Sequence, residues 1–260
     1  MTSELVHLEK SDGVATITLD SPHNRNALSR QLIGELGGHL EAALGDPGTR
    51  VIVLTGTGTV FCSGADLKEQ RVANESGGRQ SGPGDLPEIL TLIWNSPKPV
   101  VGRINGSARA GGIGLVAACD IAVAPETATF AFSEVRLGVI PAIISVVVIP
   151  RIGQSRALEL FLTGDTFDGR AAATFGLLNR AVPADELDTA VSGYLDSLLK
   201  GAPGALGGCK QLARDVPLLA MDEAFEETRR RSAAYFASEE ALEGMKAFAE
   251  KRSPRWASGG

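Results

Sequence analysis

Two turns rich in small residues constrain this chain more than any other feature. Residues 61–67 read FCSGADL and residues 105–112 read NGSARAGG, and each stands where a strand pattern gives way to a helical one. An anion can approach a backbone N–H to about 2.7–3.1 Å only where no side chain blocks the way. The first N–H groups of a helix and its dipole also favour negative charge. The two turns therefore indicate either one shared anion-stabilising site or two tight loops whose glycines merely allow close packing.

Composition and charge limit the classes of protein that fit. The chain has 260 residues, of which 43% are hydrophobic and 22% charged, as expected for one large domain or a domain with a helical appendage. The net charge of -6 and the absence of long lysine or arginine runs argue against nucleic-acid binding. The longest apolar stretch, residues 139–150, is far shorter than a membrane span of about 20 residues, so no membrane role is expected.

Cysteine usage predicts the compartment. Cys62, Cys119 and Cys209 are odd in number and show no C-x-x-C spacing, which argues against a disulfide framework. The first fifteen residues interleave charged and apolar positions and contain no signal-peptide core. We therefore expect a cytoplasmic protein.

Hydrophobic periodicity predicts an α/β fold. Alternation on both sides of Asp12-Gly13 predicts a hairpin of residues 4–10 and 14–19. The pattern then predicts a helix over 29–44, a strand over 51–55, a strand over 100–104, a helix over 111–118 and strands over 121–124 and 129–132. Further helices are expected over 153–163, 168–175, 184–199, 203–214, 220–236 and 239–251. We expect repeated β-β-α turns wound into a core of residues 1–195, followed by a helical C-terminal region of residues 196–260.

Six blocks of this sequence, in order, resemble the crotonase family, also called the enoyl-CoA hydratase/isomerase superfamily. Besides the two turns, residues 20–29 (DSPHNRNALS) resemble its first coenzyme-A-contacting loop, and residues 119–124 (CDIAVA) resemble the strand after its second turn. Residues 132–141 (FSEVRLGVIP) resemble the segment with its catalytic glutamate, and residues 243–252 (EGMKAFAEKR) its closing helix. The resemblance covers about residues 5–255. It implies a crotonase-like spiral with a helical C-terminal trimerisation region, and an assembly that is a homotrimer or a dimer of trimers.

The resemblance also implies a site for an acyl-CoA thioester. Ala65 and Gly111 would donate their N–H groups to the thioester oxygen, and Glu134 would transfer the proton. Coenzyme A belongs to the substrate, so neither a separate cofactor nor a metal is expected. The acyl pocket is expected near Trp94 and residues 141–147. The residues implied in substrate binding are Arg25 and Ala27 along the coenzyme, Ser63, Asp66 and Leu67 near its adenine and pantetheine, Pro141 in the acyl pocket, and Phe248 and Lys251 reaching a neighbouring subunit's ligand.

Several of these residues have plainer explanations. Asp66 could be an acidic residue that complements a helix dipole, and Lys251 a solvated lysine at a helix end. Glu134 lies between a predicted strand and an apolar run, where burial would raise its pKa toward the working pH. The structural alternative for Glu134 is an ion pair with Arg136.

One departure from the family pattern bears on the reaction. Many hydratases of the family carry a second glutamate three positions after the glycine of the second turn, where this chain has Gly114. A lone glutamate resembles the family's enoyl-CoA isomerases. The surrounding sequence, residues 110–115, 133–138 and 141–145, resembles that of a bacterial subgroup assigned to methylglutaconyl-CoA and related branched-acyl hydration. We therefore expect hydration of a 2-enoyl-CoA, with Δ3-Δ2 isomerisation by Glu134 alone or binding of acyl-CoA without turnover as alternatives.

A glycine-rich segment, a dinucleotide-binding pattern and the possible hydrolase or metal chemistry of the chain need separate interpretation. Residues 73–87, with four glycines and two prolines, are expected to form either a lid over the acyl pocket or a surface loop. Residues 112–117 fit G-x-G-x-x-A, but the helix there is too short for a dinucleotide-binding unit. A serine hydrolase and a metal site are disfavoured, because no G-x-S-x-G occurs and all three histidines lie in the first 40 residues.

Overall fold

The computed structural model describes residues 3–75 and 85–257. It opens with the expected hairpin, because β1 (Val6–Ser11) pairs antiparallel with β2 (Val14–Leu19). Asp12 and Gly13 at the tip have φ angles of 49° and 79°. Two central residues with positive φ make the tight turn whose twist matches the flanking strands.

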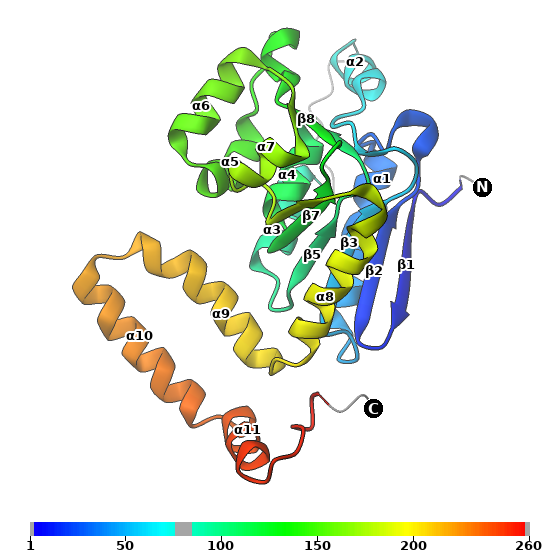
Figure 1. Ribbon diagram of the computed structural model, residues 1–260. Helices are drawn as coiled ribbons and strands as arrows, with labels where there is room; N and C mark the ends of the chain where they lie inside the picture. Colours follow the sequence, from blue (N-terminus) through cyan, green and yellow to red (C-terminus); the bar gives the residue numbers. More distant parts are fainter. Residues whose placement is uncertain (1–2, 76–84, 258–260) are drawn as a thin grey trace.

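The strands form two sheets, and after the hairpin each turn of the chain adds one strand to each sheet. Figure 1 shows β1, β2, β3, β5 and β7 of the larger sheet side by side. The six-stranded sheet has the order β1-β2-β3-β5-β7-β10, and the four-stranded sheet has the order β4-β6-β8-β9. The remaining strands are β3 (Val51–Gly56), β4 (Val60–Cys62), β5 (Val100–Arg103), β6 (Ser107–Arg109), β7 (Ile121–Pro125), β8 (Thr129–Ala131), β9 (Phe167–Asp168) and β10 (Arg180–Val182). The pairs β3 and β4, β5 and β6, and β7 and β8 are successive windings. The expected spiral of repeated β-β-α turns is confirmed.

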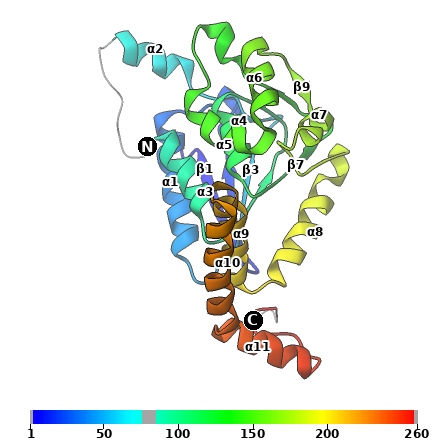
Figure 2. The same ribbon diagram turned by 90° about the vertical axis from the view of Figure 1, so that its left-hand side faces the viewer.

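Helices cover both faces of the larger sheet (Figures 1 and 2). On one face lies α1 (Arg30–Gly45), which Ser29 caps by accepting the N–H of Leu32. Its buried residues Leu32, Leu36 and Leu40 recur every fourth position and face the main core. On the other face α8 (Leu187–Leu199) closes a smaller, valine-rich core. Every residue of β3 between them is buried, as expected for a central strand of a covered parallel sheet.

Two helices near the second turn were not predicted. These are α3 (Leu86–Asn95) and α5 (Ala142–Ile152), which pack against α4 (Gly111–Ala118). The sequence of α5 is apolar on almost every side and carries Pro150, so its helical period is hidden. The other helices of the spiral are α2 (Leu67–Glu75), α6 (Gln154–Thr163) and α7 (Gly169–Thr174).

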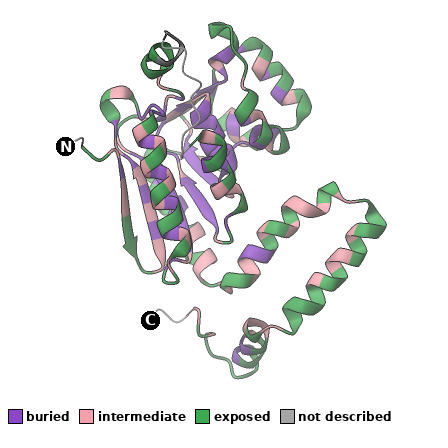
Figure 3. Cartoon of the chain, turned by 180° about the vertical axis from the view of Figure 1, so that it is seen from behind, coloured by how far each residue is buried: buried purple, intermediate pink, exposed green. Residues whose placement is uncertain are grey.

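The last three helices extend away from the spiral (Figures 1 and 2). They are α9 (Pro203–Asp215), α10 (Met221–Phe236) and α11 (Glu239–Ala249), and most of their residues are exposed or half-buried (Figure 3). The boundary expected after residue 195 falls inside α8, which still packs on the larger sheet. None of the helices in residues 3–75 and 85–257 is both long and apolar enough to cross a membrane.

Candidate active site

The two turns singled out in the sequence end neighbouring parallel strands of the smaller sheet. Strands β4 and β6 pair in parallel, with Cys62 opposite Ala108. Ala65 and Gly111 each lie three positions beyond that pair. Because the carboxyl ends of neighbouring parallel strands meet at one edge of a sheet, the register alone brings the two turns together.

Contacts show that the turns touch. A Cβ placed on Gly64 would lie 3.3 Å from the backbone nitrogen of Gly111 and 2.9 Å from the Cβ of Ala110. Within residues 3–75 and 85–257, neither the N–H of Ala65 nor that of Gly111 donates a backbone hydrogen bond. Two free N–H donors therefore belong to loops in direct contact, as an anion-stabilising site requires.

The second turn has a strained backbone. Ala110 has φ 47° and ψ -121°, a region that residues with a side chain rarely adopt, and α4 begins at the next residue. Such a conformation costs on the order of 1–3 kcal/mol and persists only where the surroundings impose it. Here the N–H of Ala110 donates to the carbonyl of Ala131, which fixes the turn to β8. Strain of this kind is common at functional sites.

Glu134 follows the third strand of the same series. Strand β8 pairs in parallel with β6, with Arg109 opposite Ala131, and Glu134 lies three positions beyond Ala131. It belongs to the short 3-10 helix η2 (Ser133–Leu137) and is 9% exposed. The topology thus places a buried carboxyl group at the sheet edge where the two turns meet.

Glu134 has the properties of a proton-transfer group. Its Oε2 atom has no hydrogen-bond partner among the described residues. Burial raises its pKa above the ordinary value of 4.5, because a low-dielectric surrounding disfavours the charged form. The alternative pairing with Arg136 is wrong, since Arg136 instead donates to Asp165 at 2.9 Å.

The first loop singled out, residues 20–29, lies directly against the first turn. The carbonyl of Arg25 accepts the N–H of Ser63 at 3.1 Å, and the N–H of Leu28 donates to the carbonyl of Gly64 at 2.8 Å. Arg25, Ala27 and Ser63 are therefore neighbours, although Ala27 itself is buried.

Buried Asn26, which the sequence analysis did not single out, holds this loop in place. Its Oδ1 accepts the N–H of Ser21, and its Nδ2 donates to the carbonyls of Thr57 and Val60. Its φ of 53° lies in the left-handed region, which asparagine tolerates better than other residues with side chains, so the residue type itself was the only available signal.

The remaining predicted residues are spread more widely. The carboxylate of Asp66 accepts the N–H groups of Lys68 and Glu69, so it acts as the cap of α2, and Leu67 beside it is exposed. Pro141 directly precedes α5. Phe248 on α11 and Lys251 just beyond it lie at the opposite end of the molecule from α2 (Figures 1 and 2). One chain does not bring those two residues to the turns.

The position of the expected second glutamate is filled by other side chains. A Cβ placed on Gly114 would lie 2.5 Å from Cγ2 of Ile144 and 3.6 Å from Cδ2 of Leu90. Helix α5 therefore packs where a second carboxylate would begin. No local pattern pointed to Ile144 and Leu90, because their helices were not predicted. The segment 73–87, expected to be either a lid or a surface loop, lies mostly outside the described residues, which stop at Glu75, the last residue of α2, and resume at Asp85.

Comparisons with family models, with curated proteins and with solved structures agree on one family. Residues 9–259 match the family model described as enoyl-CoA hydratase/isomerase. The chain is 34% identical over 260 residues to the carnitinyl-CoA dehydratase of Proteus mirabilis, covering 98% of each protein. Among solved structures it is similar to Pseudomonas aeruginosa AtuE, with a TM-score of 0.90, 32% identity and coverage of 98% of this chain and 100% of that one. It is also similar to an enoyl-CoA hydratase of Mycobacterium smegmatis, with a TM-score of 0.88, 30% identity and the same coverage.

Proposed function

The chain belongs to the enoyl-CoA hydratase/isomerase family, and we propose that within this family it adds water reversibly to a 2-enoyl-CoA thioester, one with a branched acyl group of the methylglutaconyl type. The observation that supports this most is the meeting of three segments at one sheet edge: the two turns with free N–H groups and the buried Glu134. The two N–H donors and the acid-base group thus lie just beyond the carboxyl ends of three neighbouring parallel strands.

The reaction follows from these groups. The N–H groups of Ala65 and Gly111 would donate to the thioester oxygen and stabilise the negative charge that develops as the enolate forms. Water adds its oxygen to C3, Glu134 accepts a proton from that water, and a proton passes from Glu134 to C2. Glu134 returns to its starting protonation state, and the double bond is replaced by one O–H group and one hydrogen. The raised pKa of Glu134 suits a group that must both accept and donate a proton.

The names of the relatives favour water chemistry. One similar protein is a carnitinyl-CoA dehydratase and another is an enoyl-CoA hydratase, and both names describe the removal or addition of water. The branched acyl group has weaker support, because it depends on the resemblance of residues 132–145 to one bacterial subgroup.

A second candidate function is Δ3-Δ2 isomerisation of an enoyl-CoA. The contact between the Gly114 position and Ile144 favours it, because it leaves Glu134 without a second carboxylate to hold water. Isomerisation moves one proton between C2 and C4 and requires no water, so one carboxyl group suffices.

Coenzyme binding is proposed to involve two subunits. Arg25, Ser63 and the start of α2 lie beside the first turn of one chain, whereas Phe248 and Lys251 lie far from it. We place the latter two against the ligand of a neighbouring subunit in a homotrimer or a dimer of trimers. Coenzyme A is part of the substrate, and the proposal requires no further cofactor.

A panel of acyl-CoA thioesters tests the proposal. Purified protein is incubated with 3-methylglutaconyl-CoA, crotonyl-CoA and a 3-enoyl-CoA while the absorbance of the conjugated thioester is followed. Hydration removes this absorbance, and we expect that result with the branched substrate fastest. A gain of absorbance from the 3-enoyl-CoA alone would support the isomerase instead. Binding without any change of absorbance would reject both activities.

A further inference from the structure

A cavity of about 1000 Å³ lies between α3, α5, α9 and the short 3-10 helix η4 (Val216–Leu218). It extends along α3 from Pro87 to Asn95. Leu86, one residue before Pro87, has its Cδ2 within 3.2 Å of where a Cβ on Gly111 would stand. One end of the cavity is therefore next to the proposed reaction site.

From Pro87 the lining of the cavity continues to Cys119 and Asp120, which follow the C-terminal end of α4. Helices α3 and α5 lie beside α4, with Leu90 and Ile144 against Gly114, and Arg151 at the end of α5 donates to the carbonyl of Cys119. Residues 111–119 rise by about 12 Å, which gives the distance between the two ends. The walls between them are apolar, formed by Leu90, Ile143, Val146 and Val147 among others.

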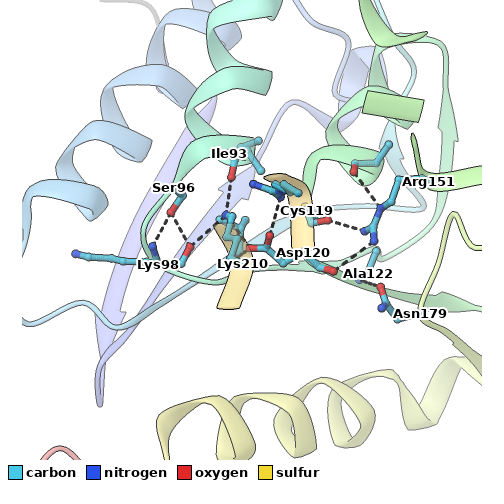
Figure 4. Close-up of polar contacts among 12 residues, drawn as sticks. Ile93, Ser96, Lys98, Cys119, Asp120, Ala122, Arg151, Asn179 and Lys210 are labelled. Carbon is cyan, nitrogen blue, oxygen red and sulfur yellow. Dashed lines mark hydrogen bonds and ion pairs between the residues drawn. The ribbon is translucent and has the colours of Figure 1, made fainter. Parts of the chain in front are cut away.

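Three cations, Arg151, Lys210 and Arg214, line the far end of the cavity, and Figure 4 shows the polar contacts of Arg151 and Lys210 there. Asp120 pairs with Lys210 and with Arg214, each at 2.8 Å. Arg151 donates to backbone carbonyls at the end of α4 and pairs with no carboxylate in the part of the chain that the structure describes. Asp215 also lines the cavity, but it pairs with Arg231 at 2.8 Å.

Of these cations, Arg214 has donors to spare. The three N–H groups of Lys210 are directed at Asp120 and at the carbonyls of Ile93 and Lys98. Arg214 uses only Nη2, toward Asp120, within residues 3–75 and 85–257. Its guanidinium lies 4.1 Å from the ring centre of Trp94, which holds its plane in position.

The charge of Asp120 does not fully offset the effect of burial on the pKa of Lys210 and that of Arg214. The pKa of Lys210 and that of Arg214 are both lowered, first of all by desolvation, although the charge of Asp120 opposes this shift. A further anion at this end would therefore stabilise the charged forms, and a guanidinium with free donors in a fixed plane suits a carboxylate.

We propose that this cavity can also receive the distal part of a longer acyl chain and that Arg214 recognises a carboxylate at its end, which makes medium-chain ω-carboxyacyl-CoA thioesters a second substrate class beside the methylglutaconyl type. The inference rests on the proposed function for the place of the thioester. A glutaconyl chain is too short to extend about 12 Å, so the chain recognised here is about twice as long. The carboxylate replaces water at Arg214, and the methylene groups contact the apolar walls.

Calorimetric binding of two saturated thioesters, decanoyl-CoA and decanedioyl-CoA, tests this without any turnover. We expect wild-type protein to bind decanedioyl-CoA about tenfold more tightly or better, as one charge-assisted hydrogen bond predicts. Arg214→Gln should remove the preference, and Arg214→Lys should restore part of it. The control Arg230→Gln, which alters an exposed arginine of α10 paired with Glu227, should keep the preference.

Equal affinities in the wild type would overturn the inference. So would a preference that survives Arg214→Gln, or a variant that weakens both ligands equally, which is the result expected if Arg214 only anchors α9. Absence of enoyl-CoA turnover would reject the proposed reaction and leave these affinities as an independent measurement.

Discussion

At the scale of single residues, Glu134 occupies an environment that is energetically unfavourable for a carboxyl group. Its carboxyl group is buried, one oxygen lacks a partner, and burial raises its pKa. An uncompensated buried carboxylate lowers stability, and proteins retain such a group where its chemistry is needed. The stability lost by burying the carboxyl group of Glu134 should therefore be measurable.

Glu134→Gln should stabilise the protein at neutral pH by about 1 kcal/mol, because a neutral amide replaces a carboxylate that burial disfavours. The size of this gain depends on pH. Folding retains a proton on Glu134 that the unfolded chain releases above about 4.5, so the wild type loses stability as pH rises from there through the raised pKa. The gain should thus be small at pH 4 and grow to a plateau. Urea unfolding at several pH values checks it, and a gain independent of pH would contradict the assignment.

At the scale of elements, the packing of α5 against α4 limits the chemistry. Gly114 of α4 has no room for a side chain, because Ile144 is β-branched and cannot easily rotate away. Gly114→Ala should lower the free energy of unfolding by about 1–3 kcal/mol through overpacking. Gly34→Ala on α1, where nothing lies within 4 Å, is the matched control and should raise it by roughly 0.5–1 kcal/mol.

A double-mutant cycle with Ile144→Ala completes this test. Truncating Ile144 opens a cavity and should itself be destabilising, but Gly114→Ala should then cost far less in that background. Equal costs of Gly114→Ala with and without Ile144 would show that the contact does not exclude a side chain at position 114.

The elements also show what sequence reasoning could reach. The hairpin at Asp12, the strands over 51–55, 100–104, 121–124 and 129–132 and the C-terminal helices carry clear local periods, and these predictions were confirmed, whereas the short strands β4, β6, β9 and β10 were not predicted. Helices α3 and α5 were not predicted, because a nearly uniform apolar run shows no helical period. The small residues of the two turns indicated that free N–H groups were one of two alternatives, whereas the filling of the Gly114 position depends on a contact between residues 30 positions apart.

At the scale of the whole molecule, the C-terminal helices leave apolar side chains exposed. Phe225, Phe236 and Leu242 are largely exposed, and Phe248 is 88% exposed. Such surfaces commonly mark an interface with another chain. An active site shared between copies would explain why Phe248 and Lys251 lie far from the turns of their own chain.

Mixed assemblies test this sharing. Glu134→Gln should lack activity, and Lys251→Ala should bind acyl-CoA roughly tenfold more weakly if it contacts the coenzyme. Co-expression of the two variants should restore activity above the sum of the separate preparations, because some sites then combine an intact Glu134 with an intact Lys251 from a neighbour. Strict additivity would mean that each chain completes its own site. Co-expression of Glu134→Gln with wild type is the control for dilution.

The central claim is that two backbone N–H groups stabilise an enolate while Glu134 moves the proton, and exchange of the C2 protons of butyryl-CoA with deuterium from solvent tests it most directly. This exchange does not depend on whether the product is hydrated or isomerised. By NMR, we expect wild-type protein to catalyse it and Glu134→Gln to slow it by about 10²–10⁴-fold, the usual contribution of a general acid-base group, with butyryl-CoA binding unchanged. Exchange at the wild-type rate in Glu134→Gln, or none in the wild type, would contradict the claim.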